Sequence, residues 1–189
     1  MGKLYYFYGT MSSGKSLNLL AKAHQFKNSG MKVTLMKPAL DTRTKNTISS
    51  RVGLEEECII VKPDENIIIP DDTDILMVDE VQFMTSEQII QLWNISREKD
   101  IRVFCYGLKT TYKNTLFESI PTLLLYRDKE EELKSQCCMC ENKATTHVLY
   151  KDGILVKDNE EHSEINIGDI VGEERYESLC QDCRKKIQK

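Results

Sequence analysis

One octapeptide constrains the possible folds of this chain more than any other feature of its sequence. It reads Gly9-Thr10-Met11-Ser12-Ser13-Gly14-Lys15-Ser16. The pattern G-x-x-x-x-G-K-[ST] follows a β-prone run at residues 3–8 and precedes helical periodicity at residues 16–28, and a chance glycine- and serine-rich turn rarely has both flanks. Backbone N–H groups of such a loop surround phosphate oxygens, and the helix N-terminus adds a favourable dipole. The sequence therefore predicts a nucleotide-phosphate loop in which Lys15 contacts the β and γ phosphates and Ser16 ligates Mg²⁺.

Strand-like and helix-like segments alternate along most of the chain. Strands are expected at residues 3–8, 31–36, 58–61, 74–79 and 102–108, and helices at residues 16–28 and after Thr85. Thr85 and Gln88 form a candidate capping box. This alternation predicts an α/β fold, a P-loop NTPase core with a mainly parallel sheet, whose ligand crevice lies beyond the carboxyl ends of the strands. Residues 39–57 show no periodicity and are interpreted as a long mobile loop of the kind that is usually functional.

Two adjacent acids, Asp79 and Glu80, end an apolar run at residues 75–78. Asp79 fits the acid that holds the Mg²⁺ shell in phosphate-loop enzymes. Glu80 would point to the opposite face if the strand continued, but at the end of the strand it can reach a substrate hydroxyl and act as general base. The alternative is a pair of solvated acids at a strand end.

Four of the seven cysteines form two C-x-x-C pairs near the C-terminus. The expected ligands of a closed, structural Zn²⁺ site are Cys137, Cys140, Cys180 and Cys183. A disulfide or redox pair is the alternative, but no export signal or thioredoxin-like context accompanies these residues. Cys138 is interpreted as a bystander, and Cys58 and Cys105 as buried apolar residues. We expect two domains: a P-loop ATP-binding domain at residues 1–133 and a small zinc-binding, ribbon-like domain at residues 134–189.

Charge and length limit the classes of partner. The chain has 189 residues and a formal net charge of −4, so it lacks the basic balance expected of a nucleic-acid-binding domain. Neither a signal peptide at the start nor a run of 18 apolar residues is evident, so no membrane partner and a cytoplasmic location are expected. A small anionic or polar substrate is the favoured partner.

Several motifs together resemble the zinc-containing thymidine kinases of bacteria, viruses and animal cytosol. They are GTMSSGKS, KPALDTR, DEVQF, CYGL, the C-x-x-C pair and YESLCQDC, and they extend over nearly the whole chain. The resemblance implies transfer of the γ-phosphate of ATP, with Mg²⁺, to the 5′-hydroxyl of thymidine or deoxyuridine. It also implies a homotetramer and feedback inhibition by thymidine triphosphate.

The same resemblance implies roles for individual residues. Glu80 becomes the catalytic base, and Asp41, Arg43 and Gln82 join the phosphate loop and Asp79 around ATP and Mg²⁺. The implied nucleoside pocket comprises Met11, Phe83, Leu108, Tyr112, Phe117, Ile170, Val171, Gly172 and Tyr176. From the residues alone, Phe83, Leu108 and Phe117 are equally consistent with ordinary core packing.

Four features depart from the family pattern and leave the selectivity for the base open. Lys109 replaces an acid, Tyr112 replaces a common phenylalanine, and His147 stands where a threonine is expected. The segment at residues 169–172 also lacks one glycine of a usual pair. A kinase for another nucleoside is therefore the main alternative within the class. A nucleic-acid-dependent ATPase with a zinc ribbon and a regulatory nucleotide-binding module are the alternatives from other classes.

Overall fold

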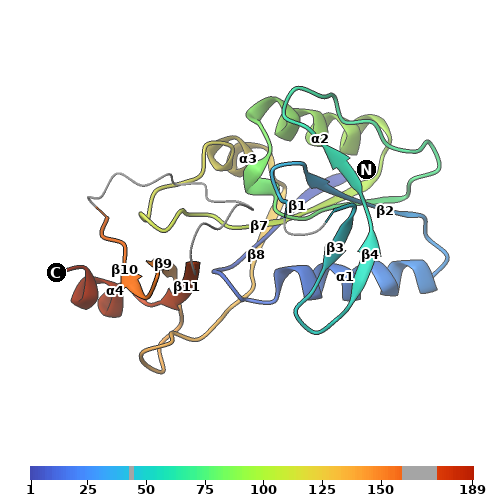
Figure 1. Cartoon of the computed structure of the whole chain (residues 1–189). Helices are drawn as coiled ribbons and strands as arrows, with labels where there is room; N and C mark the ends of the chain where they lie inside the picture. Colours follow the sequence, from blue (N-terminus) through green and yellow to red (C-terminus); the bar gives the residue numbers. More distant parts are fainter. Residues whose placement is uncertain (43–44, 159–173) are drawn as a thin grey trace.

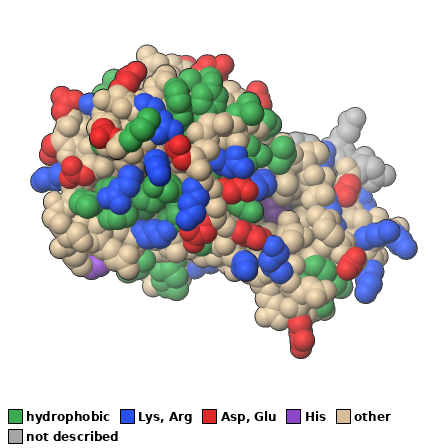
Figure 2. Space-filling model, turned by 180° about the vertical axis from the view of Figure 1, so that it is seen from behind, with side chains coloured by type: hydrophobic (Ala, Val, Ile, Leu, Met, Phe, Trp, Pro, Cys, Tyr) green, Lys and Arg blue, Asp and Glu red, His purple; other side chains and the backbone are tan. Residues whose placement is uncertain are grey.

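The computed structural model describes residues 1–42, 45–158 and 174–189, which form a larger part and a smaller C-terminal part (Figure 1). The larger part contains a sheet covered by helices on both faces, and the smaller part contains the paired cysteines. Seen from behind, the two parts form two lobes of unequal size (Figure 2). Among the described residues, no helix combines the length and apolarity needed to cross a membrane.

A six-stranded sheet with the order β5-β2-β6-β7-β1-β8 is the centre of the larger part. Its strands are β1 (Lys3–Tyr8), β2 (Val33–Pro38), β5 (Ile59–Val61), β6 (Ile75–Val78), β7 (Arg102–Gly107) and β8 (Lys129–Glu132). Every neighbouring pair is parallel. The predicted α/β fold is therefore confirmed. The charged edge strand β8 was not predicted, because its sequence KEEE has none of the apolar, β-branched character typical of a strand.

Helices cover both faces of this sheet. They are α1 (Lys15–Asn28) on one face, and α2 (Ser86–Glu98) and α3 (Ile120–Tyr126) on the other (Figure 1). Alternate residues of each strand enter the two cores, as the pleat requires: Leu4 and Tyr6 pack beneath α2 and α3, whereas Phe7 packs beneath α1. The capping box is also confirmed. The Thr85 hydroxyl accepts a hydrogen bond from the Gln88 N–H at 3.2 Å, which is worth about 1 kcal/mol.

An antiparallel hairpin occupies part of the segment that was interpreted as a long loop. Its strands are β3 (Thr47–Ser49) and β4 (Glu55–Glu57). Ile48 is 2% exposed and joins the core beneath α1, and Figure 1 shows the hairpin beside that helix. The loop interpretation was wrong for these residues, because a single buried isoleucine anchors strands whose other residues are polar or charged.

The C-terminal part is built on a three-stranded antiparallel sheet of order β10-β9-β11. Its elements are β9 (Thr146–Lys151), β10 (Ile154–Leu155), β11 (Glu174–Leu179) and the helix α4 (Gln181–Gln188). One face of the sheet, including Val148 and Leu179, packs on the cysteine cluster. Leu149, on the other face, packs against Tyr112 of the larger part. This arrangement agrees with the expected ribbon-like module, and the boundary at residues 133/134 stays a prediction.

Candidate active site

The phosphate loop lies between the carboxyl end of β1 and the first turn of α1. Gly14 has a φ of 79°, in the left-handed region that glycine adopts without strain. A Cβ on Gly9 would lie 2.6 Å from the carbonyl oxygen of Leu133, so the loop needs glycine there to pack against the segment after β8. The Lys15 ammonium donates to the Thr10 carbonyl at 2.8 Å and is thereby held over the loop. The loop therefore has the shape and the cation expected of a phosphate site.

Ser16 and Asp79 meet at the end of the loop. The Ser16 hydroxyl donates to the Asp79 carboxylate at 2.8 Å, which joins the start of α1 to the end of β6. A hydroxyl and a carboxylate are the hard oxygen ligands that Mg²⁺ prefers, so this pair fits the ion predicted there. Asp41 is also buried, and its carboxylate forms an ion pair with the Lys37 ammonium at 3.4 Å. Arg43, also predicted to lie near the phosphates, is outside the described residues.

Ser16, Asp41 and Asp79 form one wall of a cavity of about 250 Å³. Its remaining lining comes from the hairpin, namely Ile48, Ser49, Ser50 and Arg51. The hairpin's part of this lining was not predicted, because the hairpin itself was interpreted as a loop. The signal that could have indicated a reversal of the chain here is Gly53, which has a φ of 87° in the turn.

Glu80 leaves the line of β6 as soon as the strand ends. Its φ of 50° and ψ of 40° are left-handed, which is uncommon for a residue with a side chain and marks a sharp change of direction. The residue is 7% exposed, and its carboxylate accepts a hydrogen bond from the Gln82 amide at 2.5 Å. The strand therefore does not continue through Glu80, and the reading of two solvated acids does not fit its burial.

Gln82 connects the ends of two neighbouring strands. Its side-chain oxygen accepts the backbone N–H of Leu108 at 2.9 Å while its amide donates to Glu80. A Cβ on Gly107 would lie 2.4 Å from that oxygen, so a glycine at the end of β7 makes the contact possible. The side chain of Gln82 bonds to Glu80 and Leu108, and its predicted place beside ATP and Mg²⁺ stays a prediction.

Replacing Gln82 with methionine is expected to lower the free energy of unfolding by about 1–3 kcal/mol, because the buried N–H of Leu108 loses its acceptor. Turnover should also fall, since the Glu80 carboxylate loses the donor that holds it. Denaturant unfolding and steady-state kinetics measure the two effects. Gln25→Met, on the exposed side of α1, is the matched control. Equal stability of the two variants would contradict the bridging role.

The apolar residues predicted to hold a nucleoside gather in two groups. Met11, Phe83, Leu108 and Phe117 belong to one cluster, in which the Phe83 and Phe117 rings meet edge to face at 5.7 Å. Tyr112 and Tyr176 belong to a second cluster with Leu149 and Val156. Tight packing is consistent both with a pocket wall and with ordinary core. Ile170, Val171 and Gly172 lie outside the described residues.

The C-terminal part contacts the phosphate loop directly. The Ser178 hydroxyl donates to the Met11 carbonyl at 2.7 Å, and the hydroxyls of Thr10 and Ser135 lie 2.6 Å apart. His147 is buried beside Tyr176, with ring centroids 5.9 Å apart. Burial, together with the positive charges of Lys15 and Arg184, lowers the pKa of His147 to about 4, so its ring is neutral at pH 7. The strand that carries Tyr176 is thus fixed against the loop.

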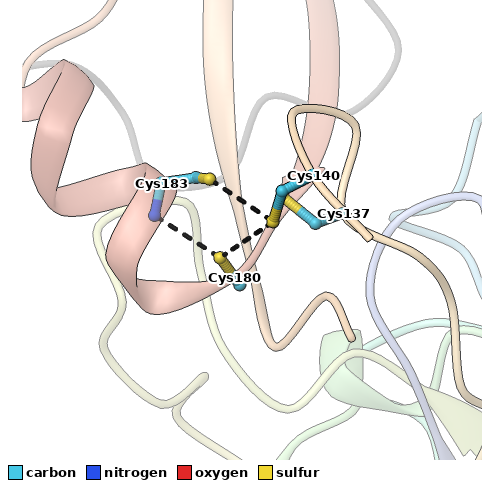
Figure 3. Close-up of side chains that lie close together, drawn as sticks. All are labelled: Cys137, Cys140, Cys180 and Cys183. Carbon is cyan, nitrogen blue, oxygen red and sulfur yellow. Dashed lines mark hydrogen bonds between the residues drawn. The ribbon is translucent and has the colours of Figure 1, made fainter. Parts of the chain in front are cut away.

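The four predicted cysteines converge on one point (Figure 3). Cys137 and Cys140 come from the turn before β9, and Cys180 and Cys183 from the start of α4. All four sulfurs lie within 4.8 Å of one another. The sulfur of Cys140 is 3.7 Å from that of Cys180 and 3.6 Å from that of Cys183. A tetrahedral zinc–thiolate site has sulfur–sulfur edges of about 3.8 Å, so the residues fit a closed four-thiolate metal site.

The ionisation of these thiols also favours a bound cation. Burial raises the pKa of the Cys137 thiol, but backbone N–H groups outweigh that effect and the pKa falls to about 6. Hydrogen bonds with the sulfurs of Cys180 and Cys140 raise the pKa of Cys183 to about 12. Four thiolates at this spacing are therefore not all ionised at pH 7 without a positive ion among them.

The chain has a phosphate loop after the first strand of a parallel sheet and an acid at the end of another strand of that sheet. These two features define the class of P-loop nucleotide-binding proteins. Comparison with known proteins narrows the class. The sequence model of the family described as thymidine kinase matches residues 2–184. The chain therefore belongs to the thymidine kinase family.

Individual relatives match this chain over almost their whole length. The thymidine kinase of Enterococcus faecalis is 37% identical over 187 residues, which cover 96% of this chain and 93% of the relative. The thymidine kinase of Streptococcus gordonii is 36% identical, with 96% and 95% covered, and that of Lactococcus lactis is 34% identical, with 96% of each covered. The family named by the sequence resemblance is thereby confirmed.

Proposed function

We propose that this protein transfers the γ-phosphate of ATP to the 5′-hydroxyl of thymidine, giving thymidine monophosphate for nucleotide salvage. The observation that carries the proposal is the position of Glu80. Glu80 directly follows Asp79, which accepts a hydrogen bond from Ser16 where the phosphate loop ends, and its buried side chain leaves the line of β6. A carboxylate beside a phosphate loop suits a reaction in which a hydroxyl loses its proton while attacking phosphorus.

In the proposed reaction, Glu80 accepts the proton of the 5′-hydroxyl. The 5′-oxygen then forms a bond to the γ-phosphorus, the bond from that phosphorus to the β,γ-bridging oxygen breaks, and its electron pair stays on ADP. Lys15 and the loop N–H groups stabilise negative charge on the transferred phosphoryl group. Ser16 and Asp79 would hold Mg²⁺, and the bound ion would neutralise further charge there.

The nucleoside would lie between the two apolar clusters. Met11, Leu108 and Phe117 offer an apolar wall from the larger part, and Tyr112 and Tyr176 meet where the smaller part packs against it. The predicted contribution of residues 170–172 belongs to the same proposal. A flat pyrimidine suits aromatic walls of this kind.

Other features of the proposal follow from the family. The four cysteines hold structural Zn²⁺, which fixes the strand bearing Tyr176 without entering the chemistry, since a closed site has no open position. A homotetramer, inhibition by thymidine triphosphate and a cytoplasmic location are expected. On the face shown in Figure 2, acidic and basic side chains are interspersed, which suits a small substrate better than a nucleic-acid backbone.

Transfer from radiolabelled ATP to a panel of nucleosides tests the proposal. Thymidine should be labelled fastest, deoxyuridine should also be labelled, and deoxycytidine and the purine nucleosides should compete poorly. If another nucleoside were labelled faster than thymidine, that nucleoside would be the preferred substrate instead. Absence of label from every nucleoside, in a preparation that binds ATP, would contradict the kinase activity itself.

A further inference from the structure

The hairpin β3–β4 is fixed in place beside the phosphate loop. Ile48 inserts into the core beneath α1, and Lys27 of α1 forms an ion pair with Glu56 of β4. Its turn is closed by the N–H of Ser50, which donates to the Leu54 carbonyl at 2.8 Å, and by the N–H of Gly53, which donates to the Ser50 carbonyl at 3.0 Å. The turn therefore presents its side chains from a defined position.

Arg51 is the basic residue that this turn contributes to the cavity above the Ser16–Asp79 pair. Its side chain is exposed, and within residues 1–42, 45–158 and 174–189 it makes no hydrogen bond or ion pair. Asp41 and Asp79 also line this cavity. Asp41 forms an ion pair with Lys37, and Asp79 accepts a hydrogen bond from Ser16.

A guanidinium in this position has the chemistry of a phosphate ligand. Its planar set of N–H donors matches two non-bridging oxygens of a phosphoryl group, and it stays charged at every working pH. Lys15 belongs to the phosphate loop and precedes Ser16, which lines the cavity, whereas Arg51 reaches the cavity from the hairpin. Two cations on separate elements can thus hold one polyphosphate from different directions.

We propose that Arg51 contacts the γ-phosphate of ATP and stabilises the charge on the phosphoryl group as it is transferred. This inference rests on the proposed function and adds a catalytic residue to it. The balance of the reaction is unchanged, because Arg51 stays protonated and neither gives nor takes a proton. Its role is electrostatic, and it acts from the same chain that provides the phosphate loop.

The inference predicts a difference between ATP and ADP. For Arg51→Ala, affinity for the Mg²⁺ complex of β,γ-imido-ATP should fall about 10- to 100-fold, the usual loss of a charge-assisted contact. Affinity for ADP, which has no γ-phosphate, should change less than about 2-fold. With ATP and thymidine, kcat should fall on the order of 10²-fold or more. Arg51→Lys should recover part of each loss, because it restores charge without the two-pronged geometry.

Calorimetric titration with imido-ATP and with ADP is the deciding experiment, with Lys45→Ala as matched control. Lys45 is exposed, belongs to the approach to the same hairpin and does not line the cavity, so its loss removes equal charge without the contact. Equal weakening of both nucleotides by Arg51→Ala, or no weakening, overturns the inference. Wild-type protein that fails to phosphorylate thymidine would refute the proposed function, while the ATP-against-ADP difference would still decide the role of Arg51.

Discussion

Glu80→Gln is expected to reduce kcat for thymidine by about two to four powers of ten, the range for loss of a positioned acid or base. The substitution keeps the size of the side chain and can still hydrogen-bond to Gln82, so the turn at the end of β6 should persist. What it removes is the group that accepts the hydroxyl proton. Steady-state kinetics with saturating ATP and thymidine measure the effect, and binding of imido-ATP should remain nearly unchanged.

Glu98→Gln provides the matched control for this substitution. Glu98 is exposed and is the last residue of α2, at the opposite end of that helix from its cap at Thr85. The Glu98→Gln variant loses the same charge as Glu80→Gln, and its kcat should equal that of the wild type. If Glu80→Gln retained wild-type turnover, Glu80 would be removed from the role of base, whatever its position in the structure.

Cys183→Ser is expected to remove the metal and to unfold the C-terminal part. Loss of one thiolate opens the site, and the affinity of structural Zn²⁺ in small domains, about 10–16 kcal/mol, is largely the free energy that folds them. Zinc content should fall from about one per chain to nearly none. Activity should fall with it, because Ser178 and Tyr176 would no longer be fixed against the phosphate loop.

Cys138→Ser is a sensitive control for the cysteine prediction. Cys138 lies within the first C-x-x-C pair, but its side chain is exposed and it is outside the sulfur cluster. Metal analysis and thermal unfolding should give wild-type values for this variant. A full complement of zinc in Cys183→Ser, or its loss in Cys138→Ser, would contradict the assignment of the four ligands.

Local sequence signals predicted the interior of the fold well. The five apolar strands, α1 and the capping box of α2 each have a pattern within their own residues, and the structure contains each within a few residues of the predicted bounds. The strand β8 and the hairpin were missed because both are polar. Pairing with the free edge of β1 defines β8, and the burial of Ile48 beneath α1 defines the hairpin. Such tertiary effects leave little trace in a short sequence window.

The candidate site likewise contains residues whose contacts could be predicted from the sequence and residues whose contacts could not. The phosphate loop, Asp79 and the four cysteines belong to short motifs, so their contacts could be foreseen from residue spacing. The direction of Glu80 could not, because it depends on a left-handed backbone turn and on Gln82, which is held in turn by the end of β7. Arg51 could not be predicted as a site residue without knowledge of the hairpin. Contacts between distant segments therefore account for what the sequence left undetermined.

The proposed reaction depends on the approach of one carboxylate to one hydroxyl. A crystal structure with thymidine and the Mg²⁺ complex of β,γ-imido-ATP tests it most directly. We expect the Glu80 carboxylate within about 3.2 Å of the thymidine 5′-oxygen, which should in turn face the γ-phosphorus above the phosphate loop. A nucleoside bound with its 5′-hydroxyl away from Glu80, and with another residue in reach of that proton, would contradict the account.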